Sequence, residues 1–177
     1  PENKKPTYLL VDGYNMIYSW SELKELADEK MDSARTKLLD ILSNYKAIKK
    51  CNIIVVFDAY RVKGHREEMI DYNNIHVVFT KEAQTADQYI EKFSYDYSKE
   101  YNIVVATSDY LQQIIVRGSG STLMSARELK LEVENAHKNH IEGYLDSQAA
   151  SSASLEDSIS KETKSQMEAI KKPSDNQ

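Results

Sequence analysis

Short, continuously apolar runs alternate along this chain with longer segments of helical periodicity. The apolar runs predict strands at residues 7–12, 52–57, 75–79 and 101–106, with a possible short strand within 118–123. Apolar residues three and four apart predict helices at 31–49, 85–98, 109–117 and 125–142, and a short helix that begins near Ser21. Strands that alternate with helices indicate an α/β fold with a central, mostly parallel sheet between two helical layers. The apolar residues of the strands are consecutive rather than alternating, as expected when helices cover both faces of the sheet.

The remaining segments are predicted to be irregular. Residues 13–15 read as a turn, and the polar stretch 59–74 as a loop with one helical turn at most. Serine becomes frequent and large apolar residues become rare after Asp146, so this segment buries too little surface to offset its ordering entropy. We therefore expect an N-terminal lead at 1–6, a folded domain at 7–143 and a mobile tail at 144–177. Only weak helix is expected in the tail, around 154–171.

Four aspartates fall where the predicted strands end. Asp12, Asp58 and Asp109 follow three of the apolar runs, and Asp87 opens the helix after 75–79. Ligands of open parallel sheets bind beyond the carboxyl ends of the strands, so we expect these acids to converge there. Carboxylates tolerate each other's proximity when a hard divalent cation lies between them. Each acid alone is equally compatible with a helix cap or a turn, but their coincidence at one edge favours a metal site.

Two further residues are candidates for this site. Asn15 adds a neutral oxygen and an amide donor close to Asp12. Glu91 lies four residues after Asp87, so both carboxylates share one face of the predicted helix. Asp58 precedes a polar loop and is a candidate for a supporting position that orients ligands or water.

Basic and aromatic residues near the same edge are candidates for contacts with a phosphate backbone or with bases. Tyr14 is a possible stacking platform for a base. Arginine and lysine side chains suit phosphate oxygens, and the candidates are Arg61, Lys63, Arg66, Arg117 and Arg127. A solvated basic loop explains the first three equally well.

The overall charge restricts any role with nucleic acid. The chain of 177 residues carries a net charge of -5, whereas binding through phosphates normally requires a basic surface. We therefore expect weak affinity for free RNA and delivery of the substrate by a larger partner. The single cysteine, Cys51, and the absence of any long apolar run predict a cytoplasmic protein without a membrane span. The chain begins at Pro1 rather than Met, as a module taken from a longer protein would.

Several segments together resemble the YacP-type NYN domains, relatives of the PIN-like ribonucleases. The segments are LLVDGYNMI, VVFDAY, VVFTKEAQTADQYIEK, VVATSDYLQQ and SGSTLMSARELKLEV, and the similarity spans about residues 7–143. The resemblance implies a PIN-like α/β/α fold and an endoribonuclease that depends on Mg²⁺ or Mn²⁺. It also implies that the substrate is mRNA and that the enzyme works in association with the ribosome.

The resemblance assigns roles to individual acids. Asp12, Asp87 and Asp109 match the metal-binding acids of the family, and Asn15 matches the asparagine of the first motif. Asp58 occupies the family's FD position, and Glu91 lies beside the TAD acid. Two rivals remain open: a catalytically inactive module of the same fold that binds RNA or the ribosome, and a phosphoryl-transfer domain of the phosphatase or receiver type. The Asp-Gly-Tyr end of the first strand argues against the second rival, because such domains favour paired acids there.

Overall fold

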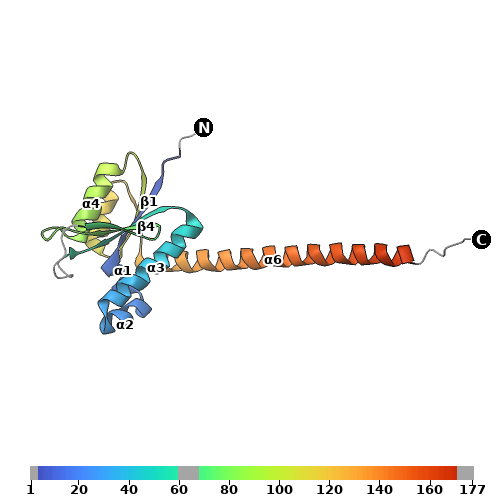
Figure 1. The fold of residues 1–177 in the computed structure, drawn as a ribbon. Coiled ribbons are helices and arrows are strands. Elements are labelled where there is room, and N and C mark those ends of the chain that lie inside the picture. Colours follow the sequence, from blue (N-terminus) through green and yellow to red (C-terminus); the bar gives the residue numbers. More distant parts are fainter. Residues whose placement is uncertain (1–3, 60–67, 171–177) are drawn as a thin grey trace, which may run out of the picture. The chain divides into compact units, whose positions relative to one another are not determined.

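A six-stranded sheet forms the centre of the structure, a computed structural model that describes residues 4–59 and 68–170 (Figure 1). The strands are β1 (Thr7–Asp12), β2 (Asn52–Phe57), β3 (Glu68–Tyr72), β4 (Ile75–Phe79), β5 (Asn102–Ala106) and β6 (Thr122–Met124). Their order in the sheet is β3-β4-β2-β1-β5-β6. All neighbouring pairs are parallel except β3 and β4, which are antiparallel. The sheet is therefore mostly parallel, as the alternation of strands and helices predicts.

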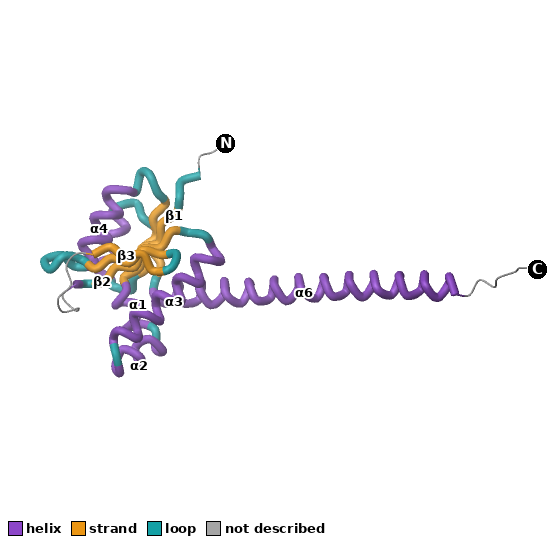
Figure 2. The backbone as a smooth tube through the Cα atoms, viewed as in Figure 1, coloured by secondary structure: helices purple, strands orange, loops and turns teal. Residues whose placement is uncertain are grey.

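Helices cover both faces of the sheet (Figure 2). They are α1 (Gly13–Ser19), α2 (Ser21–Glu29), α3 (Met31–Lys49), α4 (Ala86–Tyr97), α5 (Tyr110–Gly118) and α6 (Ala126–Ile170). Leu9 and Val11 of β1 belong to a core shared with α1, α2, α3 and the start of α6. Leu10, between them, belongs to a second core shared with α4 and α5. Alternate side chains of a strand point to opposite faces, so the three-layer α/β/α architecture explains why β1 is apolar at successive positions.

Two elements were not predicted from the sequence. The segment expected as a turn at 13–15 begins the helix α1, whose Met16 and Ile17 are fully buried. The segment expected as a loop at 59–74 contains β3, an exposed edge strand that pairs with β4 alone. An edge strand needs no continuous apolar run, since its outer side faces solvent and charged residues there discourage further pairing. The hydrophobic pattern therefore gave no signal for β3.

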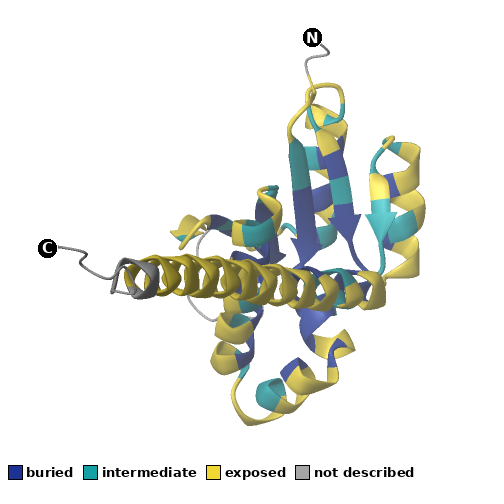
Figure 3. Cartoon of the chain, turned by 90° about the vertical axis from the view of Figure 1, so that its right-hand side faces the viewer, coloured by how far each residue is buried: buried dark blue, intermediate teal, exposed yellow. Residues whose placement is uncertain are grey.

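The end predicted for the last helix is wrong. The helix α6 does not stop at Gly143 but continues to Ile170, so the irregular tail expected from residue 144 is helical over 144–170. A single glycine costs a helix only about 1 kcal/mol, and α6 contains no proline after it. The low apolar content was predicted to leave this segment with little buried surface. Every side chain of residues 138–166 is indeed exposed (Figure 3). Backbone contacts divide the chain into two compact units, Pro1–His137 and Lys138–Gln177. None of the described helices is long and apolar enough to span a membrane.

Gly13 marks the closest approach between β2 and the start of α1. A Cβ atom at Gly13 would lie 2.3 Å from Cε1 of Phe57, whose ring is fully buried. The Phe57 ring is also packed against Tyr14 and Phe79, with ring centroids 5.0 and 5.6 Å away, so it has no room to retreat. Glycine is therefore required here for space, and the Asp12-Gly13 pair is fixed to the core directly below the sheet edge.

We predict that Gly13→Ala lowers the free energy of unfolding by about 1–3 kcal/mol, because an extra methyl group in a filled core forces neighbouring side chains to move. Urea unfolding followed by circular dichroism measures this change. Gly118→Ala is the matched control, since no described atom lies within 4 Å of a Cβ there, and its effect should be below about 1 kcal/mol. Equal stabilities of the two variants would contradict the steric role of Gly13.

Candidate active site

The strand register brings three of the four aspartates to one edge of the sheet. Asp12 ends β1, the strand between β2 and β5, and it pairs with Val56 of β2. Asp58 lies two residues beyond Val56. On the other side Val11 pairs with Ala106 of β5, so Asp109 lies two residues beyond the neighbour of Asp12. The three acids therefore flank one point at the carboxyl ends of the central strands, as predicted.

Each of these three carboxylates also accepts a hydrogen bond from the start of a helix. Oδ1 of Asp12 accepts from the Asn15 N–H in α1, at 3.3 Å. Oδ1 of Asp58 accepts from the Ala86 N–H of α4, at 2.5 Å, and Oδ1 of Asp109 accepts from the Gln112 N–H of α5, at 3.0 Å. Unpaired N–H groups at helix starts favour such acceptors. These aspartates therefore both bond to helix starts and converge at one edge of the sheet, and the two roles are compatible.

Thr80 holds together the two segments that bear Asp58 and Asp87. Its side chain is fully buried at the end of β4; its hydroxyl accepts from the Ala59 N–H at 3.2 Å and donates to the Gln84 carbonyl at 2.6 Å. Gln84 leads into α4, whose first turn contains Asp87. Together with the bond from Asp58 to α4, this places the fourth acid beside the other three.

Asn15 connects α1 to the segment between β5 and α5. Its side-chain oxygen accepts from the Ser108 N–H at 2.8 Å, and the Ser108 hydroxyl accepts from the N–H of Ala126, the first residue of α6. Asn15 also lies beside Asp12, which accepts its backbone N–H, and its side-chain oxygen is already bonded to Ser108. Its side-chain amide remains as a donor group at this edge.

The acids act on one another electrostatically. Burial, followed by the negative charges of Asp87, Asp58 and Asp109, raises the pKa of Asp12 to about 7, against the lowering effect of the Asn15 N–H. Burial, followed by the charges of Asp109 and Asp58, also raises the pKa of Asp87. Repulsion of this kind acts between carboxylates that share one region of the structure. Asp12 is the buried member of the group, with only 9% of its surface exposed.

The carboxylates do not form a ready-made ligand cluster. Among residues 4–59 and 68–170, no three His, Cys, Asp or Glu side chains form a group that could hold a metal ion directly. Asp12, Asp87 and Asp109, the metal-binding acids that the sequence predicts, therefore do not form a direct ligand set, and two of them bond to helix starts instead. The donor chemistry still fits a hard cation. Mg²⁺ keeps several waters and needs only one or two carboxylates, and each capping acid uses a single oxygen for its cap.

The other predicted site residues have different outcomes. Glu91 is exposed one turn after Asp87 in α4, and Arg127 is exposed in the first turn of α6. Arg117 is exposed in the last turn of α5, about 10 Å along the helix from its start and thus away from the acids. The remaining basic candidates, Arg61, Lys63 and Arg66, lie outside the described residues.

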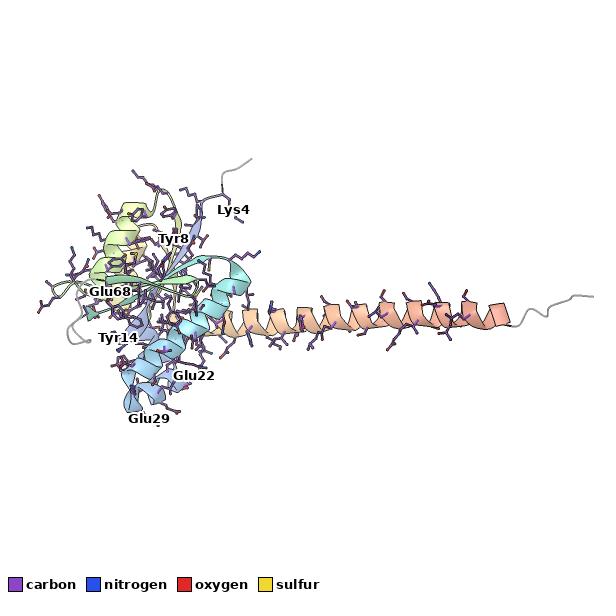
Figure 4. All side chains as sticks on the ribbon, in the orientation of Figure 1. Lys4, Tyr8, Tyr14, Glu22, Glu29 and Glu68 are labelled. Carbon is purple, nitrogen blue, oxygen red and sulfur yellow. The ribbon has the colours of Figure 1, made fainter. Side chains whose placement is uncertain are left out.

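The prediction that Tyr14 offers a stacking surface is wrong. The residue is only 4% exposed; its ring packs against Phe57, and its hydroxyl accepts a hydrogen bond from Arg35 at 3.1 Å (Figure 4). Tyr14 lies two residues after Asp12, and this proximity to the acids in sequence suggested a role at the surface. Its position on the inner face of α1 instead makes it part of the core.

Sequence reasoning missed the residues that hold the acids in place. Thr80 and Ser108 both follow an apolar strand, and a hydroxyl residue at such a position is a recognisable signal for bonds to the neighbouring loop. This signal does not reveal the hydrogen-bond partners. Thr80 bonds to Ala59, which follows another strand, and Ser108 bonds to segments far away in sequence.

An α/β/α domain with acids gathered at the carboxyl ends of its central strands defines a nuclease-like domain of the NYN type. The model of the YacP-like NYN domain family matches residues 9–172, and the chain belongs to this family. It is 42% identical over 131 residues to the uncharacterized protein YacP of Bacillus subtilis (strain 168), covering 73% of this chain and 76% of that protein.

Two solved structures show the same fold. The crystal structure of Rae1 (YacP) from Bacillus subtilis superimposes with a TM-score of 0.67 and 37% identity, covering 91% of this chain and 92% of the other. The crystal structure of a mutant of the same protein gives a TM-score of 0.66 and 39% identity, covering 75% of this chain and 78% of the other. These similarities confirm the fold and the family that the sequence motifs indicate.

The raised pKa of Asp12 predicts that stability falls as pH rises from about 4 to 7 without divalent cations. In this range the folded protein keeps a proton that the unfolded chain, with a carboxyl pKa of 3.8, releases. The shift of about 3 units corresponds to a loss of at most about 4 kcal/mol.

Urea unfolding in EDTA at several pH values measures this loss. Asp12→Asn should weaken the pH dependence and be more stable than the wild type at pH 8, since asparagine keeps the cap of α1 without the charge. Parallel pH profiles for the two proteins would show that Asp12 titrates normally.

Proposed function

We propose that this protein is a metal-dependent endoribonuclease that cleaves mRNA in association with the ribosome. The observation that carries the proposal is the convergence of four mutually repelling carboxylates at the carboxyl edge of an NYN domain. Such a concentration of negative charge is costly unless a cation or protons neutralise it. Nuclease-like domains use this arrangement to bring a cation to a phosphodiester.

In this proposal Asp12, Asp87 and Asp109 hold Mg²⁺ or Mn²⁺, partly through water. A bound divalent cation lowers the pKa of water and offsets the developing charge on the scissile phosphate. The protein's own residues then fix geometry. The Asn15 amide donates to a phosphate oxygen or to an ordered water, Asp58 holds the start of α4, and Glu91 orients water beside Asp87.

Attack of water on phosphorus, with departure of the 3′ oxygen, leaves a 5′-phosphate and a 3′-hydroxyl. The RNA 2′-hydroxyl need not react in this mechanism. The net charge of -5 supports delivery of the RNA by a larger assembly, because positioning by a partner replaces affinity that a basic surface would otherwise supply. An mRNA held on a ribosome meets this requirement.

A second candidate function is a catalytically inactive module that binds RNA or the ribosome. The observation in its favour is that, within the described residues, no direct metal-binding group is assembled. The two candidates differ in whether divalent cations bind to the acids and whether RNA is cut.

We predict that Asp87→Asn lowers the rate of RNA cleavage by at least about 100-fold in the presence of Mn²⁺, because it removes a charged ligand that the fold does not replace. Cleavage is measured on mRNA with and without ribosomes, and EDTA should abolish it. Asp96→Asn is the matched control, since Asp96 is exposed near the other end of α4 and should leave the rate unchanged. Rates unaffected by both Asp87→Asn and EDTA would disprove the metal mechanism. Intact folding and ribosome binding without any cleavage would favour the inactive module.

We also predict that Mg²⁺ or Mn²⁺ raises the free energy of unfolding at pH 8, by about 2.7 kcal/mol when the cation is at 100 times its dissociation constant. The gain should be much smaller at pH 5, where protons compete for Asp12 and Asp87, and smaller in Asp87→Asn at either pH. Thermal unfolding with potassium chloride at matched ionic strength is the control. A gain of equal size in the wild type and in Asp87→Asn would place cation binding elsewhere.

A further inference from the structure

Most apolar residues of the helix α5 are exposed to solvent, and among them only Val116 is buried in the core. Tyr110 and Leu111 at its start are 72% and 70% exposed, and Ile114 and Ile115 on the next turn are 50% and 45% exposed. The polar Gln112, in contrast, is 2% exposed, and neither of its side-chain amide atoms has a hydrogen-bond partner among the described residues. Packing among the described residues does not explain the exposure of these four apolar side chains. The exposed apolar surface begins at the residue after Asp109.

Tyr110 is the aromatic residue of this surface that lies at the acidic site. Asp109, which precedes it in the chain, caps α5 and raises the pKa of both Asp12 and Asp87 through its charge. Consecutive Cα atoms are about 3.8 Å apart, so the Tyr110 side chain originates at the rim of the acid cluster. Within the described residues its ring forms no aromatic pair and its hydroxyl no hydrogen bond. The ring is therefore accessible to a ligand.

The chemistry of the site favours an uncharged contact with the substrate. Four carboxylates repel a phosphate backbone, so ionic contacts with RNA are weakest at the point where it must be held. Stacking of a base on an aromatic ring does not depend on charge and accepts any base. It requires an unpaired base, because the faces of a paired base are already covered by its neighbours. An exposed tyrosine beside the acids supplies this contact.

We propose that Tyr110 is the stacking platform for an unpaired base next to the scissile phosphate, with Leu111 extending the apolar surface. This inference rests on the proposed function in that it takes RNA as the substrate. It gives Tyr110 the role that Tyr14, being buried, does not perform. It also predicts a preference for single-stranded RNA that is set by stacking rather than by a basic groove.

The test uses the full chain with Asp87→Asn as the parent, so that RNA is bound but not cut. Short single-stranded RNAs carry 2-aminopurine, a fluorescent base whose emission falls on stacking, at successive positions. The parent should quench the probe at one or two positions. Tyr110→Ala should remove the quenching and weaken binding about 5- to 150-fold, whereas Tyr110→Phe should retain both. Thermal unfolding should be the same for all variants, because the side chain is exposed.

Tyr95→Ala is the matched control. Tyr95 is 80% exposed on α4, eight residues and about 12 Å along the helix from Asp87, so its removal should change neither quenching nor affinity. The affinity ratio between the parent and Tyr110→Ala should also be independent of salt, since stacking releases no counterions, whereas the affinity of each protein falls as salt rises.

Two results would overturn the inference. One is the absence of quenching by the parent, or quenching that Tyr110→Ala leaves unchanged. The other is loss of ribosome binding in Tyr110→Ala with RNA binding intact, which would identify the apolar surface of α5 as a protein-docking site. Base quenching that depends on Tyr110 in a protein that cuts no RNA would instead refute the proposed catalysis and leave the stacking contact established.

Discussion

The burial of a carboxylate at the end of the central strand is the constraint on which the site depends. Asp12 lies between β2 and β5, almost without contact with water, and the strand register fixes where Asp58 and Asp109 follow on either side. A carboxylate in such a place is stable only with a proton or with a nearby cation. The raised pKa of Asp12 expresses the first alternative, and the proposed metal site expresses the second. The same geometry therefore couples the protonation, the stability and the proposed chemistry of this edge.

The hydrogen bonds that build the fold also limit the site. Asp12, Asp58 and Asp109 each accept, through one oxygen, an N–H at the start of a helix, so the helices α1, α4 and α5 are bonded directly to the acids. A cation that recruits the remaining oxygens need not break these caps. It does compete with them wherever a carboxylate must turn, and this favours coordination through water over a closed cage of ligands. The same caps explain why no direct cluster is present among the described residues.

The sequence predicts the parts of this structure that depend on local pattern. The buried parallel strands have continuous apolar runs. The end of each run marks the end of a strand, so the acids that follow the strands can be identified from the sequence. Tertiary contacts decide the remainder. Tyr14 is predicted at the surface because it follows Asp12, but α1 turns it inward onto Phe57. The edge strand β3 lacks the apolar run that would predict a strand. The extension of α6 past Gly143 depends on helix propensity without burial. The hydroxyl of Thr80 was overlooked because its partners lie on two different segments.

The stacking role proposed for Tyr110, which the buried Tyr14 does not perform, follows from the negative charge of the site. An acidic site that acts on a polyanion gains catalytic electrostatics at the expense of affinity, so its substrate must be held by contacts that carry no charge or by a partner. In the stacking proposal the exposed apolar start of α5 supplies the first kind of contact, directly beside Asp109. In the proposed function, delivery by a large assembly supplies the second. The two are complementary, because a partner brings the RNA to the edge whereas stacking fixes which phosphate faces the acids. If RNA is the substrate, as proposed, an aromatic residue at the rim of the acidic site therefore supplies a contact that the charge of the site does not oppose.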